Sequence, residues 1–136
     1  INKNLIKMNK EITIVKNLEK LDGLRVINDI NEAVNVLQNG ETICRFEYGS
    51  SMHPIAVSGQ YCRLEPLHGE IPNIGDMVLN CLGDDYIWNT HMVWNVNKAS
   101  GYILIGDSHH NLFGWTNKYV ALAIPMPYAE QEREED

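Results

Sequence analysis

The chain has 136 residues, of which 44% are hydrophobic and 21% charged, a length and composition that indicate one globular domain and exclude wholesale disorder. No apolar run approaches the roughly 18 residues that a membrane-spanning helix needs, so we expect no membrane span. The net charge of −7 argues against nucleic acid as a partner, because binding to phosphates requires clustered Lys and Arg side chains.

The first element that the sequence predicts is a short helix over residues 29–38, preceded by a lead-in over residues 1–28. Asp29 can cap this helix with Glu32 as its reciprocal partner, and Gly40 suits the left-handed position that ends a helix. The apolar residues at helical spacing are Ile30, Ala33, Val34 and Leu37.

After the helix, apolar and polar residues alternate in short runs separated by Gly- and Asp-rich turns, which is typical of β-strands. Such a series predicts a mainly β domain over residues 29–127, with an antiparallel sheet that curls on itself. The acidic residues 128–136 are expected to form a disordered tail. The predicted strands are residues 42–48, 61–65, 77–82, 86–96, 102–105 and 119–124.

The three cysteines, Cys44, Cys62 and Cys81, are an odd number at wide spacing and form no zinc-binding pattern. We therefore expect buried, reduced thiols in a cytoplasmic protein, with no metal or other cofactor.

The sharpest local pattern is the segment Gly49-Ser50-Ser51-Met52-His53-Pro54, directly after a predicted strand. A glycine two residues before Ser51 and a proline three residues after it favour a tight corner. Such a corner can present a hydroxyl together with backbone N–H groups, as a nucleophile and its oxyanion site require. The same residue types also form ordinary turns between strands, so a plain turn is the alternative interpretation.

Two further segments carry groups that could act with a serine. His91 lies inside a predicted strand, and Asp107 follows Gly106 at the end of another. A serine, a histidine and an aspartate can serve as nucleophile, general base and orienting acid. The sequence order alone does not distinguish this arrangement from unrelated residues of a small domain.

Four of these segments, in their order along the chain, resemble the LexA and signal-peptidase superfamily of serine peptidases. They are Gly49–Pro54 as G-x-S-M-x-P, Gly75-Asp76-Met77-Val78, His91-Met92-Val93 on a strand, and Ile105-Gly106-Asp107. The resemblance spans residues 41–124. It implies a curled, partly open barrel of antiparallel strands with one short N-terminal helix.

The resemblance also implies residue roles and a substrate class. Ser51 is the expected nucleophile, with the neighbouring turn at Gly49, Ser50, Met52 and Pro54 helping to form the oxyanion site. His91 is the expected general base, and Asp107 its supporting acid. The implied activity is that of a soluble endopeptidase that cleaves an extended peptide or protein segment beside small side chains, through an acyl-enzyme.

Departures from the family pattern keep a second function open. The His-Arg pair usual in the histidine-type members reads His91-Met92 here, and Ser108 and His109 follow Asp107. The alternative is a catalytically silent relative that acts as a structural or protein-binding module, for example in a phage particle, where it would be virion-associated. A metal or small-ligand site at His91, His109 and His110 is a third possibility.

Overall fold

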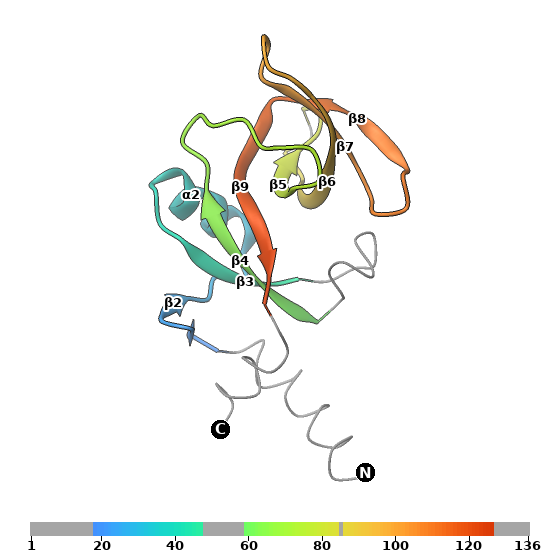
Figure 1. The fold of residues 1–136 in the computed structure, drawn as a ribbon. Helices are drawn as coiled ribbons and strands as arrows, with labels where there is room; N and C mark the ends of the chain where they lie inside the picture. The colour runs from blue at the N-terminus through green and yellow to red at the C-terminus, as the bar shows by residue number, and fades with distance from the viewer. Residues whose placement is uncertain (1–17, 48–58, 85, 127–136) are drawn as a thin grey trace, which may run out of the picture.

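The computed structural model of the chain describes residues 18–47, 59–84 and 86–126. Within these ranges one helix and two sheets are formed (Figure 1). The helix is α2 (Ile30–Gln38), and the two-stranded sheet pairs β1 (Lys20–Leu21) with β2 (Leu24–Arg25). The strands of the large sheet are β3 (Ile43–Glu47), β4 (Gln60–Pro66), β5 (Met77–Cys81), β6 (Trp88–Asn97), β7 (Tyr102–Gly106), β8 (Leu112–Thr116) and β9 (Lys118–Pro125).

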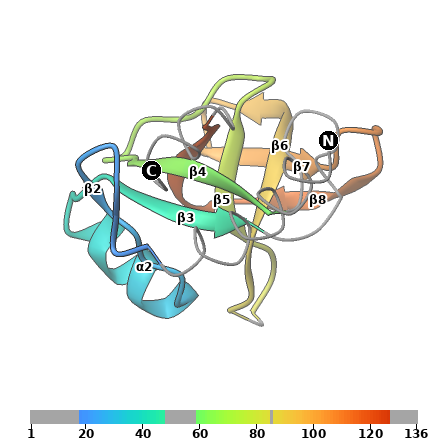
Figure 2. The ribbon, with the colours of Figure 1, turned by 90° about the horizontal axis from the view of Figure 1, so that it is seen from below.

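The strands of the large sheet follow the order β3-β4-β9-β5-β6-β7-β8, and every neighbouring pair is antiparallel. The predicted mainly β, antiparallel architecture is therefore confirmed. Among the described strands β3 and β8 are the two edges, so the sheet is not a closed barrel. Viewed from below, α2 lies beside β3 at one end of the molecule, and β6, β7 and β8 lie at the other (Figure 2).

The predicted helix is confirmed as α2, with Asp29 as its N-cap. The Asp29 carboxylate accepts a hydrogen bond from the backbone N–H of Glu32 at 2.9 Å, which satisfies one of the free donors at the helix start. Gly40 ends the helix in the left-handed region at φ 91°, and a Cβ atom there would lie 3.3 Å from the His68 ring. Both features explain why the helix begins and ends where the sequence predicts.

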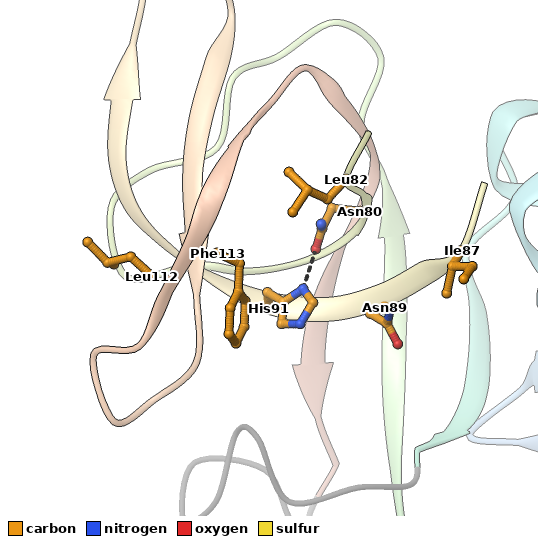
Figure 3. Close-up of a pocket in the computed structure, with 7 residues that line it drawn as sticks. All are labelled: Asn80, Leu82, Ile87, Asn89, His91, Leu112 and Phe113. Carbon is orange, nitrogen blue, oxygen red and sulfur yellow. Dashed lines mark hydrogen bonds between the residues drawn. The ribbon is translucent and has the colours of Figure 1, made fainter. Parts of the chain in front are cut away.

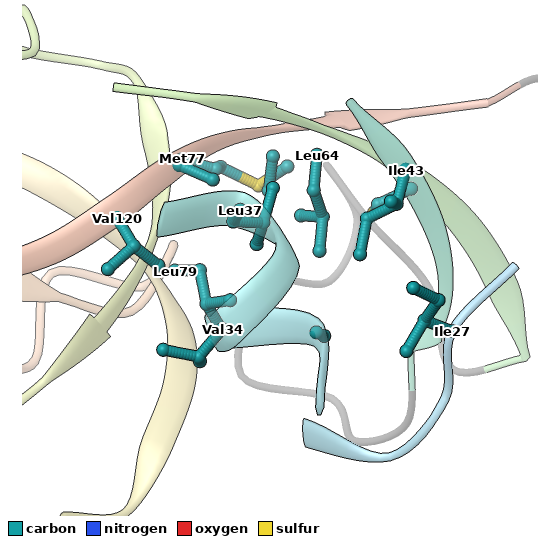
Figure 4. Packing of buried hydrophobic residues seen from close by; sticks show 12 residues of the cluster. Ile27, Val34, Leu37, Ile43, Leu64, Met77, Leu79 and Val120 are labelled. Atoms are coloured by element: carbon teal, nitrogen blue, oxygen red, sulfur yellow. The ribbon is translucent and has the colours of Figure 1, made fainter. Parts of the chain in front are cut away.

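The strand β5 lies at the centre of the sheet, and each of its five residues is buried. Met77 and Leu79 face the cluster that also holds Leu37 of the helix. Val78 faces a second cluster on the other side of the sheet. Figure 4 shows the first cluster, in which apolar side chains of α2 meet those of the strands. A strand covered on both faces explains the near-continuous apolar sequence of β5.

The hairpin of β1 and β2 lies within the predicted lead-in. Its turn residues Asp22 and Gly23 both have positive φ, at 54° and 77°, which is the backbone of a tight hairpin turn. Leu21 in this hairpin is fully buried and packs with Phe46 and Tyr61 of the large sheet. Part of the lead-in therefore contributes to the core.

The three cysteines are buried, as predicted. No helix in the described ranges has the length and apolar character that crossing a membrane requires. The predicted turn Gly49–Pro54 and the predicted tail 128–136 lie outside the described residues.

Candidate functional site

The candidate site is built on the pairing of β5 with β6. In this ladder Val78 lies opposite His91, and Asn80 lies opposite Asn89. Because side chains alternate between the two faces of a strand, Asn80 and His91 are diagonal neighbours on one face. The sheet register therefore places a buried amide beside the strand histidine.

The Asn80 side chain is 1% exposed, and its amide meets Nδ1 of the His91 ring at 3.1 Å (Figure 3). In the orientation drawn, the amide oxygen faces Nδ1 and also the backbone carbonyls of Val78 and Asn89. Turning the amide by 180° places its nitrogen there instead, 3.3 Å from the Val78 oxygen and 3.0 Å from the Asn89 oxygen. A carbonyl oxygen can only accept, so the turned amide, which directs its N–H groups toward these neighbours, is the favoured orientation.

His91 borders an open pocket of about 560 Å³. The apolar walls come from Leu82, Ile87, Leu112 and Phe113, and the polar lining comes from Asn80, Asn89 and His91. The Phe113 ring packs edge-on against the imidazole, with ring centroids 4.9 Å apart and planes at 65°. Figure 3 shows Asn80 of β5 and Phe113 of β8 beside His91 of β6.

Burial lowers the pKa of the His91 imidazole below its ordinary value, because partial removal from water disfavours the charged form. The negative charge of Asp107 acts in the opposite direction and raises the pKa, but its effect is the smaller one. Relative to a water-exposed histidine, the folded protein therefore favours the neutral imidazole.

Asp107 is 8% exposed and follows β7, next to the residue that pairs with Met92 of β6. Its carboxylate accepts hydrogen bonds from the backbone N–H groups of His109 and Asn111, both at 2.9 Å, and from the Asn111 amide at 2.7 Å. These bonds, led by the Asn111 amide, lower the pKa of the Asp107 carboxyl. The His91 ring contacts the Asn80 amide at hydrogen-bond distance, and Asp107 acts on the ring through its charge.

Gly106 has a steric reason to lack a side chain. A Cβ atom there would lie 2.5 Å from the Asn111 backbone oxygen and 2.9 Å from Cδ1 of Trp94. The Trp94 indole N–H donates to the Asp107 backbone oxygen at 2.9 Å, and its ring stacks on His110 with centroids 4.3 Å apart. The Gly-Asp pair thus builds the turn between β7 and β8 as well as placing a carboxylate near His91.

Among the predicted site residues, the structure places His91 on β6 and Asp107 directly after the neighbouring strand β7. Ser51 lies outside the described residues, as do its predicted turn partners Gly49, Ser50, Met52 and Pro54, so their roles stay predictions. The sequence reasoning missed Asn80 and Phe113. The available signal for Asn80 was a single amide inside the apolar run from Met77 to Leu82.

The alternative metal site gains no support from the described part of the chain. No group of three or more His, Cys, Asp or Glu side chains there is arranged to hold a metal ion. The His110 ring is stacked on Trp94 in the turn.

No family model matches the chain, and neither the curated proteins nor the solved structures contain a match.

Proposed function

We propose that the chain is a serine endopeptidase in which Ser51 is the nucleophile and His91 the general base. The observation that carries the proposal is the setting of His91, which lines an open, apolar-walled pocket and whose pKa is lowered by burial. A neutral imidazole is the form that can accept a proton from a serine hydroxyl. The sequence resemblance of the Ser51, His91 and Asp107 segments to serine peptidases supports the assignment.

In the proposed reaction the Ser51 oxygen attacks the peptide carbonyl carbon, and its proton passes to His91. The tetrahedral intermediate then collapses, the C–N bond breaks, and the amine leaves with the proton that His91 held. Water attacks the resulting ester, again giving a proton to His91, and the acid product and free Ser51 are restored. The nearby negative charge of Asp107 favours the transient imidazolium.

The proposed substrate is an extended peptide that pairs with an edge of the sheet through its main chain. Of the two edges in the described sheet, β8 also supplies Leu112 and Phe113 to the pocket. Both side chains are exposed, as is Ile87 across the pocket. These walls favour an apolar peptide side chain near His91.

The test is incubation of the purified chain with an unstructured polypeptide, followed by mass spectrometry of the fragments. The proposal predicts discrete cleavage by the wild type and none by Ser51→Ala, with a large loss for His91→Phe. Trp115→Ala is the matched control, because this exposed aromatic lies on β8 but does not line the pocket. Equal cleavage by the wild type and Ser51→Ala would overturn the proposal.

A second candidate function is a catalytically silent module that binds a peptide in the same pocket. The observation in its favour is that the Asp107 carboxylate is engaged by three hydrogen bonds from its own turn. This candidate predicts peptide binding without cleavage, and binding that Phe113→Ala weakens and Ser51→Ala leaves unchanged. Isothermal calorimetry with the same peptides distinguishes the two functions.

A further inference from the structure

The amide of Asn80 decides which nitrogen of His91 carries the proton. Its amide nitrogen faces the backbone oxygens of Val78 and Asn89, which cannot donate, and also Nδ1 of His91 at 3.1 Å. An amide nitrogen offers two N–H groups and accepts no hydrogen bond, so an Nδ1–H group that faced it would have no acceptor, and the unprotonated form of Nδ1 is favoured. A neutral imidazole holds one proton, so that proton lies on Nε2.

We propose that Asn80 is a positioning residue that holds His91 as the neutral tautomer with its proton on Nε2, so that the resting pocket offers a hydrogen-bond donor to a carbonyl oxygen. Nε2 lies on the side of the ring away from Asn80 (Figure 3), and none of the described residues makes a hydrogen bond to it. A peptide carbonyl is the group of the proposed substrate that such a donor would bind. The inference rests on the proposed function only for the identity of this ligand.

The contact between the Asn80 amide and Nδ1 also opposes the proposed role of His91 as general base. To accept a proton from Ser51, Nε2 must first lose its proton to water while Nδ1 gains one from water, so the ring stays neutral. An Nδ1–H group then requires an acceptor, which Asn80 supplies only by turning its oxygen toward the ring. That oxygen would face the carbonyls of Val78 and Asn89 and leave buried polar groups unsatisfied. Asn80 thus favours the binding tautomer over the catalytic one.

Nuclear magnetic resonance of the 15N-labelled wild-type chain tests the inference without any substitution. The two ring nitrogens of a neutral histidine have well-separated 15N shifts that report which one is protonated. The His91 signals are assigned by their loss in His91→Phe. We expect a protonated Nε2 and an unprotonated Nδ1 above the pKa of the ring. A protonated Nδ1 in the wild type would overturn the inference.

Asn80→Asp provides the second arm, because a carboxylate at this position accepts from Nδ1. We expect the proton to move to Nδ1 and the His91 titration to shift to higher pH. Asn89→Asp is the matched control, since it adds the same charge to the same pocket opposite Asn80 on the ladder. It should leave the proton on Nε2. The inference fails if both variants keep the wild-type tautomer.

If Asn80→Asp does not fold, the wild-type spectrum alone decides. The tautomer is measured without substrate, so its outcome is independent of cleavage. A wild type with a protonated Nδ1 that still cleaves peptide would overturn this inference and leave the proposed function intact. A wild type that shows the expected tautomer but cleaves no peptide would overturn the proposed function and leave this inference intact.

Discussion

The Phe113 ring lies edge-on against the His91 imidazole at 4.9 Å and joins the edge strand β8 to the central part of the sheet. In this contact the exposed Phe113 side chain of β8 covers part of the His91 imidazole of β6. It is one reason that the imidazole is removed from water although its pocket is open.

Removing this ring should raise the pKa of His91. Phe113→Ala exposes the imidazole to water, and burial is the main cause of its lowered pKa. The measurement is an NMR titration of the His91 ring. Trp115→Ala, on the same strand but not lining the pocket, should leave the titration unchanged. An unchanged or lower pKa in Phe113→Ala would show that another group controls the ring.

The stability of the protein should fall in mild acid because of His91. Its pKa is lowered on folding, so between the folded pKa and the unfolded value of about 6.5 the unfolded chain binds more protons. The free energy of unfolding should therefore decrease as pH is lowered from about 6.5 through the folded pKa, and level off below it.

Urea unfolding at a series of pH values measures this effect, with His91→Phe as the reference protein. The difference between the two proteins should depend on pH only in that window. Asp107 titrates at lower pH in both proteins, because its own pKa is lowered, so its protonation lies outside this window. A pH-independent difference would contradict the prediction.

A methyl group at Gly106 should destabilise the turn after β7. In Gly106→Ala the new Cβ would meet the Asn111 backbone oxygen at 2.5 Å, and a backbone atom cannot move aside as a flexible side chain can. Overpacking of this kind costs about 1–3 kcal/mol. Thermal unfolding should show a clear fall in Tm, and an unchanged Tm would mean that the turn adapts without cost.

Truncation of the buried helix face should cost more than truncation of the exposed face. Leu37 is 1% exposed in the core cluster, and Leu37→Ala should lower the free energy of unfolding by about 2–5 kcal/mol. Asn35→Ala, on the exposed face of α2, should change it by less than about 0.5 kcal/mol. Similar losses for both variants in urea unfolding would contradict the packing described for α2.

Local signals in the sequence were sufficient for the helix and most strands. The Asp29 cap, the apolar stripe and Gly40 together define α2, and alternation defines strands such as β4. The edge strand β8 was missed because Gly114 interrupts it and its residues are mostly exposed, so it has no regular apolar face. The hairpin at Leu21–Leu24 was missed because two-residue strands are too short for periodicity, although its Asp-Gly turn was a usable signal.

The sequence likewise predicted only part of the candidate site. His91 and Asp107 could be selected by residue type and position, and the structure places His91 on β6 and Asp107 directly after the neighbouring strand β7. The role of Asn80 could not be predicted, because it depends on the register that sets Asn80 diagonal to His91. Register is a property of the assembled sheet, and a shift of one residue would turn the amide to the other face.

The most direct test of a peptidase that uses Ser51 and His91 together is a double-mutant cycle on peptide cleavage. The rate constants are those of the wild type, Ser51→Ala, His91→Phe and the double variant. When two residues act as one catalytic unit, substituting either of them removes nearly all of the rate enhancement that the pair provides. We therefore expect the double variant to be no slower than the slower single variant. Losses that multiply, or a wild type that cleaves no faster than Ser51→Ala, would contradict the proposed mechanism.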